Sequence, residues 1–93
     1  MIGGVVIEII ELNDRMWINC REKIGHHECA IYVEKTNKSR SISEGDIIWW
    51  QAGWAMWTPA FNRGEYGSRC GKDFDIRLKR IGYSGVNKPS LSI

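Results

Sequence analysis

The chain has 93 residues, of which 43% are hydrophobic and 26% are charged, and its formal net charge is +2. These values are typical of one small folded domain spanning residues 1–93, and they exclude a disordered chain and a two-domain protein. The weak net charge also argues against a general polycation that coats nucleic acid.

The N-terminal stretch MIGGVVIEIIEL has no basic leader, long apolar core or small-residue cleavage site, so we do not expect a signal peptide. No stretch approaches the roughly 20 apolar residues that a membrane span needs. Three cysteines, an odd number, fit a reducing compartment better than a secreted disulfide framework. We therefore expect a cytoplasmic protein without a membrane partner.

Short alternating segments separated by turns dominate the first half of the chain. Val5–Leu12 and Arg15–Arg21 flank Asn13 and Asp14, which tolerate the positive φ of a tight turn, so we predict a β-hairpin here. Cys29–Glu34 alternates again and predicts a third strand. The side chains expected to face inward are Met16, Ile18, Cys20, Cys29, Ile31 and Val33.

A second hairpin is predicted after the polar, exposed loop of residues 35–43. A turn at residues 44–46 leads into Ile47–Gln51, and Ala52 and Gly53 can close a tight turn onto Trp54–Thr58. Pro59 ends that strand because it has no amide donor.

The C-terminal third is basic, with seven Lys and Arg against three acidic residues over positions 63–93. An irregular, Gly-rich basic loop is expected at about 62–72 and a loosely held tail at about 86–93. Between them, Phe74–Ile81 predicts the last strand, and Gly82–Gly85 is expected to turn away from it. The charge asymmetry fits either a local anionic partner or a solvated basic face.

About six short strands with turn signals between them predict an all-β or mainly β fold, built as a small single-domain barrel or sandwich. OB-like, SH3-like and PUA-like barrels all fit this pattern.

Four of the five tryptophans fall within nine positions of the second hairpin. Alternation places Trp49 and Trp50 on opposite faces of one strand, and Trp54 and Trp57 on opposite faces of the other. Whichever face is buried, at least one indole stays outside. The hairpin is therefore predicted to be a contact surface, either a ligand platform or a self-association patch that makes a homo-oligomer.

Indoles beside cations suit a nucleotide-like ligand, because bases stack on the rings while Arg or Lys binds phosphate. No phosphate-loop or dinucleotide-binding glycine motif is present. The predicted ligand-binding residues are Trp50, Trp54, Trp57, Arg63, Arg69, Arg77 and Lys79.

Metal binding and catalysis are weaker interpretations. A zinc set could in principle be drawn from Cys20, His26, His27, Cys29 and Cys70. The spacing does not match the C-x₂₋₄-C pairs of zinc fingers, so buried free thiols and an exposed histidine loop are preferred. Glu44 and Asp46 flank a turn glycine, where acids commonly cap backbone amides. No nucleophile with an oriented base can be nominated, so we expect neither an enzyme nor a cofactor.

The run Gly45-Asp46-Ile47-Ile48-Trp49-Trp50-Gln51, followed by Trp57-Thr58-Pro59 and by residues 78–85, resembles small uncharacterised proteins encoded by tailed bacteriophages. The resemblance implies expression in a bacterial host cytoplasm and raises two roles: sequestering a nucleotide signal of host immunity, and handling nucleic acid.

Three functions follow as hypotheses. The first is a non-enzymatic anti-defence protein that captures a nucleotide-like anion such as a cyclic nucleotide immune signal. The second is a single-stranded nucleic-acid-binding module. The third is a protein-interaction module whose tryptophan patch inhibits a host enzyme, a form of host–virus interaction.

Overall fold

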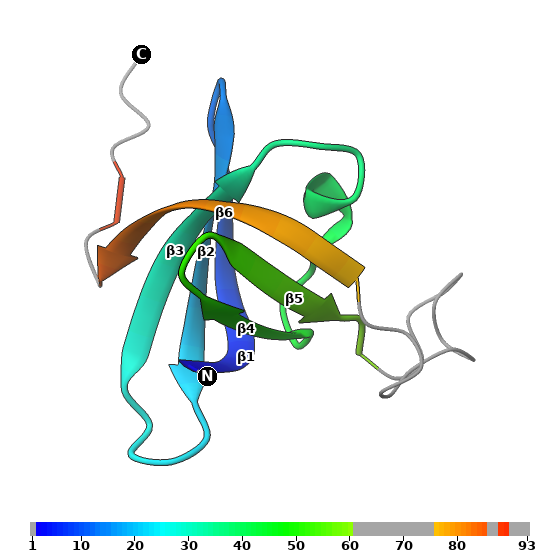
Figure 1. Ribbon diagram of the computed structural model, residues 1–93. Helices are drawn as coiled ribbons and strands as arrows, with labels where there is room; N and C mark the ends of the chain where they lie inside the picture. Colours follow the sequence, from blue (N-terminus) through cyan, green and yellow to red (C-terminus); the bar gives the residue numbers. More distant parts are fainter. Residues whose placement is uncertain (1, 61–75, 86–87, 90–93) are drawn as a thin grey trace.

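The computed structural model describes residues 2–60, 76–85 and 88–89, and within them the chain is almost entirely β-structure (Figure 1). Within these ranges one 3₁₀ turn, η1 (Ser39–Ser41), interrupts the strands. The strands are β1 (Ile2–Glu11), β2 (Arg15–Glu22), β3 (Glu28–Glu34), β4 (Ile47–Gln51), β5 (Trp54–Thr58) and β6 (Ile76–Gly85). The prediction of an all-β fold with six strands is confirmed.

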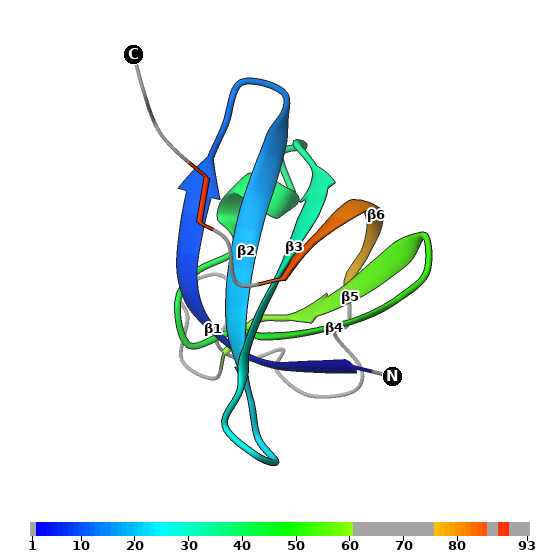
Figure 2. The same cartoon turned by 90° about the vertical axis from the view of Figure 1, so that its left-hand side faces the viewer.

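The six strands close into a barrel in the order β1-β2-β3-β6-β5-β4, and every neighbouring pair is antiparallel. The order consists of two three-stranded meanders, β1–β3 and β4–β6, joined along β1–β4 and β3–β6. In Figure 2 the β4–β5 hairpin projects away from β2 and β3. The outer surface of β4–β6 therefore faces a different side of the molecule from that of β2 and β3. Closure removes the unpaired strand edges through which open sheets aggregate.

The start of β1 holds the barrel together because it pairs with β2 and β4 at once. Gly3 and Gly4 make this possible. A Cβ at Gly3 would lie 2.3 Å from the carbonyl oxygen of Ile48, and a Cβ at Gly4 would lie 2.0 Å from that of Arg21. A register shift between Val6 and Glu8 marks a β-bulge, which lets the strand bend as it passes from one partner to the other.

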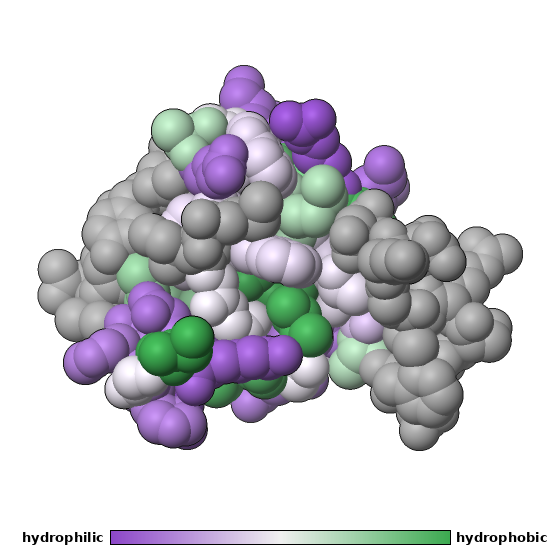
Figure 3. Space-filling view, turned by 60° about the horizontal axis from the view of Figure 1, so that its bottom comes forward, coloured by the Kyte–Doolittle hydropathy of each residue, from purple (hydrophilic) through white to green (hydrophobic). Residues whose placement is uncertain are grey.

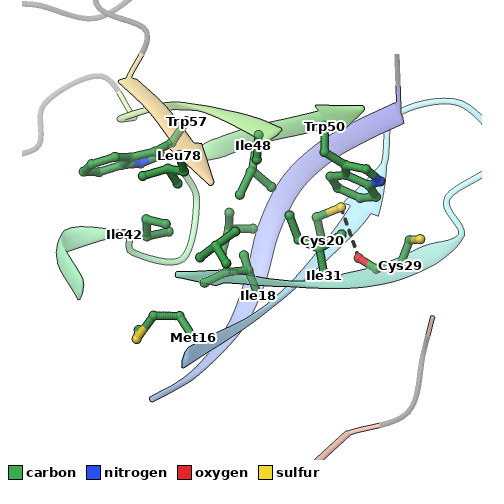
Figure 4. Close-up of a cluster of buried hydrophobic side chains, with 13 residues drawn as sticks. Met16, Ile18, Cys20, Cys29, Ile31, Ile42, Ile48, Trp50, Trp57 and Leu78 are labelled. Atoms are coloured by element: carbon green, nitrogen blue, oxygen red, sulfur yellow. Dashed lines mark hydrogen bonds between the residues drawn. The ribbon is translucent and has the colours of Figure 1, made fainter. Parts of the chain in front are cut away.

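The barrel interior is filled by one apolar cluster in which Trp50 and Trp57 lie toward opposite ends, with Ile48 between them (Figure 4). All the residues predicted to face inward belong to it. Cys20 and Cys29 lie directly opposite each other on β2 and β3, and the Cys20 thiol donates a hydrogen bond to the Cys29 carbonyl oxygen at 3.3 Å. They are free thiols that pack as small apolar side chains, as expected.

Asp46 is a fully buried carboxylate that fixes the β3–β4 connection to β5. Its Oδ2 accepts hydrogen bonds from the Ser43 N–H at 2.9 Å and from the Trp57 Nε1–H at 2.8 Å. Its Oδ1 accepts the Ala60 N–H at 2.8 Å. These bonds satisfy a charge that would otherwise be costly to bury. The predicted capping role of this acid is confirmed.

Two sequence predictions are corrected. The residues from Gly82 to Gly85 do not turn away: β6 runs on to Gly85, because it leaves β5 and continues against β3, with register shifts on the way. The connection 35–43 is not wholly exposed either. Ser39 is buried, and its hydroxyl donates to the Glu34 carbonyl oxygen at 2.7 Å.

Two further predictions concern segments that the structure does not describe, or describes only in part. The basic loop at 62–72 lies outside them. Of the predicted loose tail, Lys88 and Pro89 are described, and the Lys88 ammonium forms an ion pair with Glu8 on β1.

Candidate functional site

The outer surface of β4, β5 and β6 carries aromatic and cationic side chains in two cross-strand rows. One row runs Gly3–Trp49–Met56–Arg77 over four strands, and the next runs Gln51–Trp54–Lys79 over three. Residues directly opposite in antiparallel strands point to the same side, so these side chains share the outside of the barrel. We call the surface formed by Trp49, Gln51, Trp54, Met56, Arg77 and Lys79 the outer face.

Trp54 is the centre of this face. The Arg77 guanidinium lies over its ring at 4.7 Å from the centroid, a cation–π contact that holds both groups in place. Lys79 is directly opposite Trp54 in the β5–β6 register. Arg77 and Lys79 are exposed, whereas Trp54 is half-buried, and no ion pair joins either cation to a described carboxylate. Positive charge therefore sits beside an accessible aromatic ring.

Two shallow hollows flank the Arg77–Lys79 ridge. One, of about 500 Å³, lies between the ridge and the β4–β5 turn and is lined by Ala52, Gly53 and Trp54. The other, of about 430 Å³, lies on the β3 side and brings in Lys38 together with Glu34, Thr36 and Asn37. Both hollows share Arg77, Leu78 and Lys79, so the same two cations face a ligand in either hollow.

A separate groove of about 460 Å³ lies where β1, β4 and the β2–β3 turn meet. Its lining residues are Gly3, Gly4, Glu22, Lys23, Ile24, Ile47 and Trp49. Ile24 is 89% exposed and Trp49 41%, and among the described residues these are the large apolar side chains most open to solvent. Figure 3 views this end of the molecule, where green apolar residues lie beside purple hydrophilic ones.

The structure brings together three of the predicted ligand-binding residues and corrects two. Trp54, Arg77 and Lys79 meet on the outer face. Trp50 and Trp57 do not: they are 2% and 0% exposed and fill the barrel interior, where no base can reach their rings. Alternation places Trp50 beside Ile48 inside, and the bond to Asp46 fixes the Trp57 indole inside as well.

The remaining predicted residues, Arg63 and Arg69, lie outside the described part of the chain. Sequence reasoning missed Trp49, Lys38 and Ile24. Trp49 could have been identified from the sequence, because strand alternation places it on the other face of its strand from Trp50. Nothing in the sequence singled out Lys38 or Ile24, because each lies in a polar loop. Only the folded structure shows that they line the hollow and the groove.

The residues named as a zinc set do not form a site among those described. Cys20 and Cys29 are buried in the core, whereas His26 and His27 are exposed in the β2–β3 turn. No three His, Cys, Asp or Glu residues of the described ranges gather as metal ligands, and Cys70 lies outside those ranges. Burial raises the pKa of the Cys20 thiol to about 12, with smaller contributions from Cys29 and Glu22. A thiol in that state is a poor metal ligand and a poor nucleophile.

Searches of protein-family models, curated proteins and solved structures found no match to this chain. The resemblance to bacteriophage proteins and the expected cytoplasmic location therefore stay predictions. Within the described residues, no helix has the length and apolar character of a membrane span.

Proposed function

We propose that the protein binds ligands that contain nucleotides, with a base stacked at Trp54 and phosphate held by Arg77 and Lys79. The observation that supports this most is the Arg77 guanidinium over the Trp54 ring, with Lys79 opposite that ring in the next strand. A base can stack on the exposed part of this aromatic–cation pair, and the two side chains donate hydrogen bonds to phosphate oxygens.

Lys38 adds a third cation on the far side of the ridge, so negative charge is favoured along both hollows. Glu34 lines the same hollow and limits how close a phosphate comes to that end. The shape is an open sheet surface rather than a closed pocket, which is typical of proteins that bind single strands. A free nucleotide messenger carries the same base and phosphate, so both ligand sources belong in the test.

Fluorescence titration tests the proposal with single-stranded DNA and RNA decamers, cyclic dinucleotides and cyclic trinucleotides, and isomers of cyclic ADP-ribose. Stacking a base contributes about 1–3 kcal/mol, so Trp54→Ala is expected to weaken binding roughly 5- to 150-fold. With Arg77, Lys79 and Lys38 as phosphate contacts, log K against log salt is expected to fall with a slope of about −2 for a single strand.

Arg15→Gln is the matched control for the test variant Arg77→Gln. Arg15 also lies over an aromatic ring, 5.4 Å from the centroid of Tyr32, but on a different side of the barrel. We expect Arg77→Gln to weaken binding and Arg15→Gln to leave it unchanged. Equal loss in both variants, or no binding of any ligand in the panel, would refute the proposal. Tight binding of one cyclic nucleotide without oligonucleotide binding would favour the anti-defence role.

A further inference from the structure

We infer that the groove beside Trp49 is a second base-binding site, so that the ligand is a single strand of at least two nucleotides. This inference rests on the proposed function and goes further, because it assigns a site to residues outside the Trp54 cluster and selects single-stranded nucleic acid among the nucleotide ligands.

The groove and the Trp54 hollow are two distinct aromatic sites. Their lining residues do not overlap: Trp49, Ile24 and Ile47 belong to the groove, whereas Trp54 belongs to the hollow beside the β4–β5 turn. Trp49 and Trp54 occupy diagonal positions on β4 and β5, since Trp49 is opposite Met56 and Trp54 is opposite Gln51. Two separate rings with separate hollows can hold two bases.

Arg77 sets the order of the two sites across the outer face. Its guanidinium lies over Trp54, and its position on β6 is in the same cross-strand row as Met56 and Trp49. Neighbouring strands are about 4.8 Å apart, so the β6 and β4 backbones are separated by about 10 Å along that row. Trp54 on β5 lies between them. A strand that crosses the outer face from β6 toward β1 would therefore place a phosphate at Arg77, then a base at Trp54, and then the next base at Trp49.

The walls of the groove fit a planar ring. Gly3 and Gly4 line the β1 side of the groove with backbone alone. Ile24 and Ile47 supply apolar contacts on the other sides, and its volume of about 460 Å³ is within the range of small-molecule sites. A base placed there covers the exposed surfaces of Trp49 and Ile24, which otherwise stay in water.

The charges at the rim indicate which base fits. Lys23 is available to a phosphate, and the Glu22 carboxylate accepts hydrogen bonds but donates none. Cytosine and adenine carry an exocyclic amino donor, which thymine lacks. We expect the groove to prefer cytosine or adenine over thymine.

The test compares dCMP with oligo(dC) and oligo(dT) of one to six nucleotides, using wild-type protein, Trp49→Ala, Ile24→Ser and Trp54→Ala. Wild-type protein is expected to bind oligo(dC) more tightly than dCMP and more tightly than oligo(dT). Trp49→Ala and Ile24→Ser should each weaken oligo(dC) binding about fivefold or more while weakening dCMP binding less, because dCMP can also bind at Trp54. Ile24 is 89% exposed, so its substitution does not put folding at risk.

The outcomes separate the two proposals. If Trp54→Ala weakens binding but Trp49→Ala and Ile24→Ser do not, the second base site is wrong and the proposed function stands. If no nucleotide of any length binds, both are wrong. If Trp49→Ala converts a dimer to a monomer by light scattering without changing oligo(dC) affinity, the groove holds a second copy of the chain, and the inference is overturned.

Discussion

The buried hydrogen bonds of Asp46 provide the sharpest test of how this fold is held. Asp46→Asn keeps the shape of the side chain but replaces one acceptor oxygen with an NH₂ group that only donates. Even if the remaining oxygen takes the position of Oδ2, the new NH₂ faces the Ala60 N–H, and one buried donor is left unsatisfied. An unsatisfied buried group costs about 1–3 kcal/mol, and the remaining bonds lose their charge assistance.

The expected loss in the free energy of unfolding is therefore about 3 kcal/mol, a large share of the stability of a domain of this size. With a urea m-value of about 1.5 kcal/mol/M, the unfolding midpoint should fall by about 2 M. Far-ultraviolet circular dichroism follows unfolding without relying on tryptophan. Asp14→Asn is the matched control, because Asp14 is exposed and pairs only with its neighbour Arg15 among described residues; its midpoint should not move.

A double-mutant cycle measures the hydrogen bond between Asp46 and Trp57. Trp57→Phe removes the indole N–H donated to Asp46 and leaves a cavity in the core, so it should cost more than the lost hydrogen bond alone, which contributes about 1 kcal/mol. Asp46→Asn weakens the Trp57 bond by removing its charge assistance, and Trp57→Phe deletes that bond. Asp46→Asn with Trp57→Phe should therefore cost less than the sum of the two, by up to about 1 kcal/mol. Strict additivity, or an unchanged midpoint in Asp46→Asn, would refute the role assigned to this carboxylate.

Further outcomes follow from single residues. Gly4→Ala should destabilise the fold more than Gly45→Ala does in thermal unfolding, because a Cβ at Gly4 meets the Arg21 carbonyl at 2.0 Å, whereas Gly45 has open space and only an unfavourable φ of 94°. Ser39→Ala should lower the free energy of unfolding by about 1–3 kcal/mol in urea titration, since the Thr36 N–H loses its buried acceptor. Native Cys20 should resist alkylation at pH 8 by peptide mass mapping and react in urea. Its raised pKa, from 9.0 to about 12, favours the neutral thiol in the fold, so its contribution to stability is present below pH 9 and is lost as pH rises toward 12.

The alternating pattern of the sequence predicted most of the strands, because residues with period two record which face is buried. It could not decide which face of the tryptophan hairpin is inside. Ile47 and Ile48 are equally apolar, and each face carries indoles, so the pattern is symmetrical. The choice depends on a contact 11 residues away, between Asp46 and the Trp57 indole, which no local pattern contains.

Local sequence patterns also did not predict which strands pair to close the barrel. Gly82 and Gly85 indicated a turn, yet they lie within β6, where the strand passes from β5 to β3 through register shifts. Of the residues predicted to bind a ligand, Trp54, Arg77 and Lys79 lie together on the outer face, whereas Trp50 and Trp57 are buried and the exposed Trp49 lies on that face instead.

The most direct test of the outer face uses the five indole N–H signals in a ¹H–¹⁵N NMR spectrum, one for each tryptophan. Trp49 and Trp54 have exposed ring surface on the outer face, whereas Trp17, Trp50 and Trp57 are buried. On titration with oligo(dC), the signals of Trp49 and Trp54 are predicted to shift while the other three stay nearly fixed. Shifts confined to the three buried indoles, or no shift in any of the five, would contradict the account.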